Sequence, residues 1–242
     1  MLRVILGIGV IATAGGASAA EAQKVTAAQV LDKYVVATGG KAGYERLRTF
    51  AMEGRITVKG QGIGGTMKAH MKAPNKFYVV QNIQGIGEAR QGYDGKIGWS
   101  KDPFMGLRKL QGAELELTRV LSDMQGPVKW RELFKRAELV GVRNVEGKRT
   151  HAVKMIPHRA KPITGYYDSA TGLMLRMDVT MESPQGVIPM QVVAKDYRMV
   201  GGIKIPYQMT QRMGAVMEMS IRITSAKAGV AVSDSIFTIP AK

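Results

Sequence analysis

The side chains that most often carry chemistry are few in this chain and lie far apart. Cysteine is absent, and the three histidines, His70, His151 and His158, show no pairing of the HExxH or HxH type. A metal site needs several such ligands at close spacing, and thiol chemistry needs cysteine. The sequence therefore predicts no metal site, no cofactor and no thiol-based catalysis.

Other patterns with catalytic potential are also weak. The glycine-rich stretch at 60–65 resembles a nucleotide-binding loop, but it lies between two predicted strands with no helix after it, which favours a flexible hairpin. Glu114 and Glu116 fall on different faces of a predicted helix, and no G-x-S-x-G nucleophile elbow occurs. We therefore expect a protein that is not an enzyme.

The most distinctive pattern is apolar. Between residues 173 and 223 the chain alternates in three stretches, and methionine recurs on the apolar side, for example at Met177, Met181 and Met190. Alternation with period two predicts half-buried antiparallel strands. Methionine is flexible and polarisable, which suits a surface that must fit variable apolar shapes, although it also fills ordinary cores. Two interpretations follow, a binding wall and a packed core.

The amino terminus predicts export. Arg3 precedes an apolar run at 4–14, and Ala17-Ser18-Ala19 forms a small-x-small cleavage site. The run is shorter than the roughly 20 residues that cross a bilayer. We predict a cleavable signal peptide at 1–19, with cleavage after Ala22 as the alternative, and one domain at 20–242. Without cysteine there is no lipid anchor, so we expect a soluble periplasmic protein.

The remaining chain predicts a mainly β protein with helices. A capped helix begins after Thr26, five strands follow up to about residue 100, and strands return from about residue 137. Between these two meanders, 113–124 has a helical pattern and 130–134 is a second short amphipathic segment. We predict a curved antiparallel sheet of about 10–11 strands forming an unclosed half-barrel, covered by the N-terminal helix and a central helical lid.

Several turn and packing segments resemble one known family. They read YDGKIGWS at 93–100, GAELE at 112–116, YYDSATGL at 166–173 and FTIP at 237–240. In these segments and in its layout, the chain resembles the outer-membrane lipoprotein-sorting proteins, which are similar to the periplasmic lipoprotein carriers of the LolA and LolB type. The resemblance implies an unclosed barrel covered by helices, whose hydrophobic cavity receives the acyl chains of a lipoprotein or another lipid.

Strand alternation and this resemblance together define a predicted site. The predicted lipid-binding cavity is lined by Met52, Met67, Met71, Phe77, Val79, Trp99, Leu175, Met177, Met181, Met190, Val192, Met209, Met217 and Met219. The predicted lid uses Leu115, Leu121, Trp130 and Phe134. We expect a non-covalent carrier, with two alternatives: an envelope structural or interaction module with a filled core, or an enzyme acting on an apolar envelope substrate, for which Gln81 and Gln211 are the main inward polar candidates.

The charge of the chain indicates which partners it favours. The formal net charge is +16, which favours an anionic membrane surface or an acidic transporter or acceptor protein. The basic residues are spread singly through predicted strands, as at Lys68, Arg90 and Arg222, without an arginine-rich arm or a stacking platform. Nucleic acid is therefore not expected as a partner. As to oligomeric state, we expect a monomer.

Overall fold

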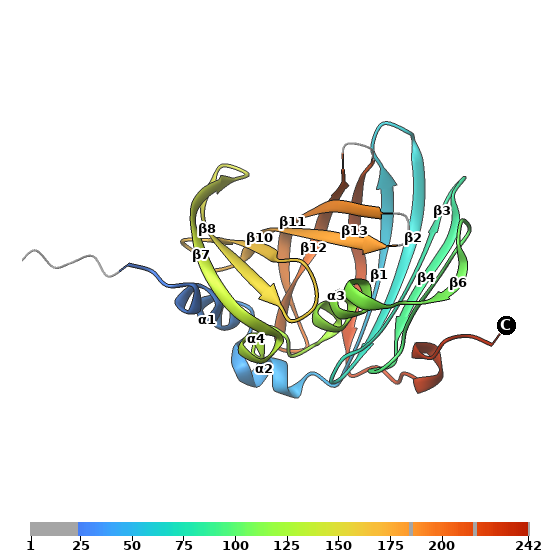
Figure 1. Cartoon of the computed structure of the whole chain (residues 1–242), viewed down its shortest axis with the longest axis horizontal. Coiled ribbons are helices and arrows are strands. Elements are labelled where there is room, and N and C mark those ends of the chain that lie inside the picture. The colour runs from blue at the N-terminus through green and yellow to red at the C-terminus, as the bar shows by residue number, and fades with distance from the viewer. Residues whose placement is uncertain (1–23, 184–185, 215–216, 242) are drawn as a thin grey trace, which may run out of the picture.

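The protein is a single curved antiparallel sheet whose two edges do not meet (Figure 1). The computed structural model describes residues 24–183, 186–214 and 217–241, and the predicted signal peptide lies outside them. The sheet has 13 strands in the order β6-β5-β4-β3-β2-β1-β13-β12-β11-β10-β9-β8-β7. Pairing of β1 with β13 joins an N-terminal and a C-terminal meander, and β6 and β7 form the edges. This confirms the predicted unclosed half-barrel.

The strands follow the chain in two runs. The first meander contains β1 (Thr49–Val58), β2 (Ile63–Lys72), β3 (Lys76–Ile83), β4 (Gly87–Tyr93), β5 (Gly98–Asp102) and β6 (Gly106–Lys109). The second contains β7 (Phe134–Val145), β8 (Lys148–Pro157), β9 (Ile163–Asp168), β10 (Met174–Ser183), β11 (Gly186–Val200), β12 (Ile203–Met213) and β13 (Met217–Ala228). The count exceeds the predicted 10–11, partly because β6 has only four residues, too few to show alternation.

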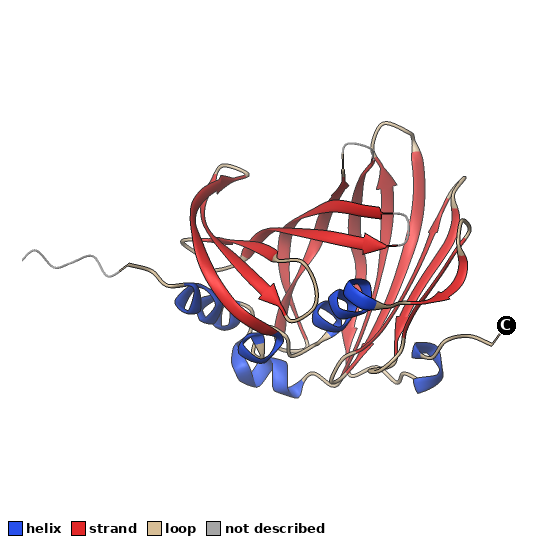
Figure 2. Ribbon diagram, viewed as in Figure 1, coloured by secondary structure: helices blue, strands red, loops and turns tan. Residues whose placement is uncertain are grey.

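The helices lie at one end of the sheet and between its two limbs, by which we mean the first meander and the second meander (Figure 2). They are α1 (Ala27–Ala37), α2 (Gly40–Arg46), α3 (Gly112–Ser122), α4 (Trp130–Leu133) and the short 3-10 helix η1 (Asp234–Phe237). Within the described residues, no helix is both long and apolar enough to span a membrane.

Local sequence explains how α1 starts and stops. Thr26 and Gln29 form a reciprocal capping box at its N-terminus. Gly39, at φ +130°, turns the chain after α1, as predicted. The next residue begins α2, a helix that was not predicted from the sequence. Gly43 of α2 packs on the β11–β12 turn so closely that an added Cβ would lie 2.4 Å from the carbonyl oxygen of Gly202. Sequence periodicity could not reveal this contact, because α2 has only seven residues.

The glycine-rich stretch at 60–65 forms the hairpin that the sequence predicted. Gly60 and Gly62, at φ +76° and +64°, lie in the turn between β1 and β2, and Gly64 and Gly65 continue into β2. No helix follows this turn, so the arrangement of a phosphate-binding loop is not formed.

Three apolar clusters make up the core. The helix-covered cluster joins α1, α3 and α4 to β8, β9 and β10, with Leu31, Leu117 and Val153 among its buried residues. The strand cluster joins β1, β2, β3 and β13, with Ile56 and Ile221 near its centre. The base cluster lies where α2 meets the sheet and includes Tyr44, Leu47, Phe50, Met124 and Ile203.

The C-terminal segment packs against the face of the sheet that lies opposite the three apolar clusters, and it covers Trp99 there. Phe237 is fully buried, and its carbonyl oxygen accepts a hydrogen bond of 2.9 Å from Nε1 of Trp99. Phe77 pairs with Tyr93, and Tyr93 pairs with Gly98 across the intervening hairpin. Gly98 therefore shares the face of the predicted cavity residue Phe77, and Trp99 points the other way. The prediction that Trp99 lines the inner cavity was therefore wrong.

Gly92 makes room for the Trp99 ring, and this gives a stability prediction. An added Cβ at Gly92 would lie 2.4 Å from Cε2 of Trp99, which is 1% exposed. We expect Gly92→Ala to lower the free energy of unfolding by about 1–3 kcal/mol, measured by urea denaturation, because the overpacked ring cannot move aside. The control is Gly64→Ala, whose Cβ meets no heavy atom closer than 3.8 Å. Equal stability of the two variants would contradict this packing.

Candidate functional site

Cross-strand register places the predicted methionines on one face of the sheet, which we call the inner face. Met209 pairs with Ile221, which pairs with Ile56, and Met190 pairs with Met213, which pairs with Met217. Side chains of directly paired residues share a face. Applied strand by strand, the register gives one inner-face set: Met52, Met67, Met71, Phe77, Val79, Met177, Met181, Met190, Val192, Met209, Met217 and Met219.

This face is packed in some places and partly open in others. Met67 and Met219 are buried, at 7% and 5% exposed, whereas Met181, Met190 and Met217 are only half-buried. Met177, Met181 and Met190 contact the helix-covered cluster, Met52, Met209 and Met217 contact the strand cluster, and Met71 contacts the base cluster. The inner face is thus mostly apolar, with half-buried methionines where the helix-covered and strand clusters meet between β11 and β12.

One predicted cavity residue is displaced by a β-bulge. In β10, Met174 pairs with Tyr167 and Arg176 with Tyr166, so Leu175 is the extra residue of the bulge. Met174, not Leu175, packs against the helix-covered cluster together with Met177. The prediction for Leu175 was wrong because strict alternation does not anticipate a bulge.

Helix α3 lies between the two limbs of the sheet and contacts β4, β8 and β10 (Figure 1). Leu117 and Val120 are its buried apolar residues in the helix-covered cluster. Leu115 lies against Gly98, where an added Cβ would lie 2.9 Å from its Cδ1. Leu117 and Val120 form the side of the helix that faces inward, whereas Leu121 is 43% exposed. The predicted role of Leu121 in the lid was therefore wrong.

The segment after α3 supplies the two other predicted lid residues. Phe134 is buried in the helix-covered cluster, and Trp130 packs against it. Nε1 of Trp130 donates to Oδ1 of Asp32 in α1 at 3.2 Å, and Arg131 pairs with the same carboxylate at 2.9 Å. These residues therefore tie α4 to α1 beside the inner face.

Polar side chains attach α3 to the sheet. Nη1 and Nη2 of Arg108 in β6 each donate to a carboxylate oxygen of Glu114 at 2.6 Å, and both side chains are mostly buried. Nε2 of Gln91 in β4 donates to the hydroxyl of Thr118 at 3.2 Å. Two-pronged guanidinium–carboxylate pairs are among the stronger polar contacts in proteins. Helix α3 is thus held by a few polar contacts in addition to its apolar stripe.

A second ion pair lies within α3. Arg119 donates to both carboxylate oxygens of Glu116, at 2.9 and 3.0 Å. The hydrogen bond from Arg119, with its charge and a backbone contact from His158, holds the pKa of Glu116 below its usual value of 4.5 despite the opposing effect of burial. Glu116 is therefore charged at neutral pH.

The inner face also carries polar residues. Gln81 pairs with Met67 and Gln211 with Met219, so both predicted candidates share the inner face. Sequence reasoning missed Gln91, Ser100 and Arg108, which continue the inner face across β4, β5 and β6. Gln91 could have been found from its alternation with Tyr93, but Ser100 and Arg108 depend on two hairpin registers.

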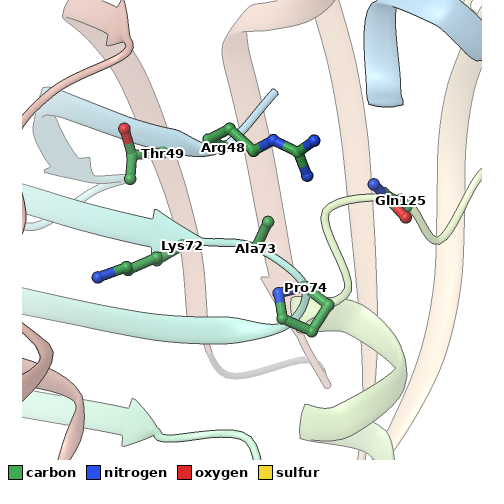
Figure 3. A pocket seen from close by; sticks show the side chains of 6 residues that line it. All are labelled: Arg48, Thr49, Lys72, Ala73, Pro74 and Gln125. Atoms are coloured by element: carbon green, nitrogen blue, oxygen red, sulfur yellow. The ribbon is translucent and has the colours of Figure 1, made fainter. Parts of the chain in front are cut away.

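The described residues also form two hollows, one away from this face and one that includes part of it. One, of about 330 Å³, lies where β1 and β2 approach the segment after α3, and Arg48, Thr49, Lys72, Ala73, Pro74 and Gln125 line it (Figure 3). The other, of about 480 Å³, lies at β10, β11 and β12. Its lining includes the inner-face residues Val179 and Met190 together with the charged residues Arg176, Asp178 and Arg212. In the described part of the chain, no group of three or more His, Cys, Asp or Glu side chains is placed to hold a metal ion.

Comparison with solved structures identifies the fold. A DUF1329 family protein from Desulfovibrio piger superposes with a TM-score of 0.57 at 15% identity, covering 88% of this chain and 97% of that one. A LolA superfamily protein from Nitrosomonas europaea gives 0.57 at 11% identity, covering 89% and 98%. The chain has a LolA-like fold. A putative outer membrane lipoprotein-sorting protein domain from Vibrio parahaemolyticus gives 0.54 at 7% identity, covering 86% and 94%. No family model and no curated protein matches the sequence.

The Arg108–Glu114 pair should contribute to the free energy that holds α3 on the LolA-like sheet. We expect Glu114→Gln to lower the free energy of local opening of α3 by about 1–3 kcal/mol, because a buried charge-assisted contact is lost. Amide hydrogen exchange of 112–122 would measure this. The control is Glu88→Gln, which removes the more exposed Arg90–Glu88 pair. Unchanged exchange in α3 of the Glu114 variant would contradict the attachment.

The Glu116–Arg119 pair predicts a pH dependence. A carboxylate whose pKa is lowered by folding contributes stability above its unfolded pKa and loses it as the pH falls through the folded value. We therefore expect Glu116→Gln to cost about 1 kcal/mol at pH 7. The difference from wild type should shrink as the pH falls below about 4.5 and vanish once Glu116 is protonated. Chemical denaturation at a series of pH values from 7 downward would measure it, and a difference that does not shrink as the pH falls would argue against the pair.

Proposed function

We propose that the protein is an exported carrier or binding protein that holds the acyl chains of a lipoprotein or another lipid non-covalently against its inner face. The observation that carries this proposal is the register that gathers the methionines on the inner side of an unclosed sheet. Several of them are half-buried, and flexible thioether side chains can adapt to chains of variable length and bend.

The energetics of such binding are favourable. Burying one methylene contributes about 0.8 kcal/mol, so ten buried methylenes give about 8 kcal/mol before the cost of immobilising the ligand is subtracted. The half-buried methionines between β10 and β13 provide apolar surface that is not yet fully buried. An acyl chain laid there would complete the contact between the helix-covered and strand clusters.

Helix α3 is the element that would move to admit a ligand. It touches strands of both limbs, and its polar attachments to the sheet, Arg108–Glu114 and Gln91–Thr118, can break and reform. Closure of such a segment over a bound ligand excludes water from the site. The predicted lid thus becomes α3 with Leu117 and Val120 as its inward residues, supported by Trp130 and Phe134.

The proposal includes where the protein works. The predicted signal peptide at 1–19 leaves a domain at 20–242 that acts in the periplasm as a monomer without a lipid anchor. The strongly basic charge, +16 for the full chain including the predicted signal peptide, supports docking on an anionic membrane surface or an acidic acceptor protein, to which the lipid would pass. The proposed step is transfer without covalent chemistry, so no residue is assigned a catalytic role.

Substitutions on the inner face test the proposal. We expect Met190→Gln and Met213→Gln each to weaken binding of a fluorescent fatty acid about tenfold, because these register partners lie where the two clusters meet. The matched control is Met199→Gln, which changes a methionine that is 58% exposed. A fluorescence titration would measure the affinity, and native mass spectrometry of the purified protein would detect lipid carried from the cell.

Two results would contradict the proposed function. One is a wild-type protein that is recovered empty and takes up no fatty-acid probe, which would instead favour an interaction module with a filled core. The other is an equal loss of binding in the Met199 control, which would show that the probe binds the outer surface.

A further inference from the structure

One register row changes from apolar to polar as it crosses the first meander. The row runs along the inner face through β1, β2, β3, β4, β5 and β6 and consists of Met52, Ala69, Val79, Gln91, Ser100 and Arg108. Paired side chains on one face of an antiparallel sheet are direct neighbours. Apolar surface and hydrogen-bonding groups thus meet in one line under α3, the arrangement that an amphiphilic ligand requires.

Two polar atoms at the end of this row are buried without a partner. Within the described residues, Oγ of Ser100 and Nε of Arg108 are shielded from solvent and make no hydrogen bond. Ser100 and Arg108 are direct register partners. Buried polar groups are nearly always hydrogen-bonded, so two unsatisfied atoms on neighbouring side chains indicate a missing acceptor.

The compensated charge of Arg108 indicates which kind of hydrogen-bond acceptor fits here. Arg108 already gives Nη1 and Nη2 to the carboxylate of Glu114, which neutralises its charge. The buried atoms still without a partner are the N–H donor at Nε of Arg108 and the hydroxyl of Ser100. A neutral oxygen with two lone pairs matches these groups, whereas an anion would gain little from an arginine whose charge is compensated.

We propose that Ser100 and Arg108 form a subsite for the ester carbonyl oxygen of a diacyl lipid, whose acyl chains then follow the apolar part of the inner face. This subsite rests on the proposed lipid-binding function and specifies the chemical class of the ligand. Diacyl phospholipids and the diacylglyceryl group of lipoproteins both carry such esters.

Helix α3 determines access to the subsite. Glu114 and Thr118 of α3 bind Arg108 and Gln91 of the row, so the helix covers these groups in the present arrangement. A lipid reaches the row when α3 moves outward. When α3 closes again it restores the Arg108–Glu114 pair, and the ester oxygen satisfies donors that otherwise stay unpaired. The polar row therefore favours a bound lipid over an unbranched hydrocarbon of the same length.

The test compares ester lipids with ether analogues by displacement of a fluorescent fatty acid. The probes are dioctanoyl phosphatidylglycerol, its dioctyl ether analogue, dioctanoylglycerol, its dioctyl ether analogue and a short-chain diacylglyceryl-cysteine peptide. For the wild-type protein we expect each ester lipid to bind about tenfold more tightly than its ether analogue, as expected for hydrogen bonds to buried donors. The ratio between the cysteine peptide and phosphatidylglycerol distinguishes a lipoprotein from a phospholipid as the source of the ester.

The variants are Ser100→Ala and Arg108→Lys, which removes Nε but keeps a positive charge for Glu114. In both, the ester preference should fall to less than about threefold while binding of the ether lipids is unchanged. Arg90→Lys is the control, because Arg90 also donates through Nε to a glutamate but lies on the opposite face. Urea midpoints of all variants check that each is folded.

Each other outcome overturns the subsite. Equal affinity for ester and ether lipids in the wild-type protein would reject it and leave the proposed function standing. Tighter binding of both phosphatidylglycerol lipids than of both glycerol lipids, with no ester preference within either pair, would assign recognition to the head group instead. Failure to bind any of the lipids or the fatty acid would reject the subsite together with the proposed function.

Discussion

The backbone hydrogen bonds of one antiparallel ladder determine which side chains can meet in this protein. Because alternate residues face opposite sides, the pairing of β1 with β13 aligns the inner faces of two meanders that are far apart in the chain. A shift of one residue in that pairing would turn Met217 and Met219 to the outer face while Met52 stayed inside. The apolar inner face, the position of α3 and the polar row at β4–β6 all depend on this register.

The ends of the sheet are stabilised in different ways, and this leaves its centre available. The second limb is packed under α1, α3 and α4, and the C-terminal segment buries Trp99 and Phe237 on the outer face of the first limb. Between them, several methionines of β10–β13, among them Met181, Met190 and Met217, are only half-buried. A fold supported at both ends can keep a less densely packed region in between, which is where adaptable side chains are most useful.

Sequence patterns predicted the parts of the structure that depend on local order. Alternation gave the strands and the inner-face methionines, and helical spacing gave α1 and α3. The errors arise where contacts between residues distant in the sequence determine the position of a side chain. The bulge in β10 displaces Leu175, and the register across the 94–97 turn places Trp99 on the outer face. In α3, Leu117 and Val120 face the sheet and Leu121 is left exposed. The Ser100–Arg108 pair was not predicted because it depends on the register of the short edge strand β6.

The methionines themselves offer the most direct measurement of the central claim, that the inner face binds acyl chains. The methionines can be labelled with carbon-13 in their methyl groups and followed by NMR as a diacyl lipid is added. Binding at the inner face predicts shifts and lipid contacts at residues such as Met181, Met190 and Met217, and no change at the exposed Met199. Shifts confined to Met199, or no contact between lipid and any inner-face methyl group, would contradict it.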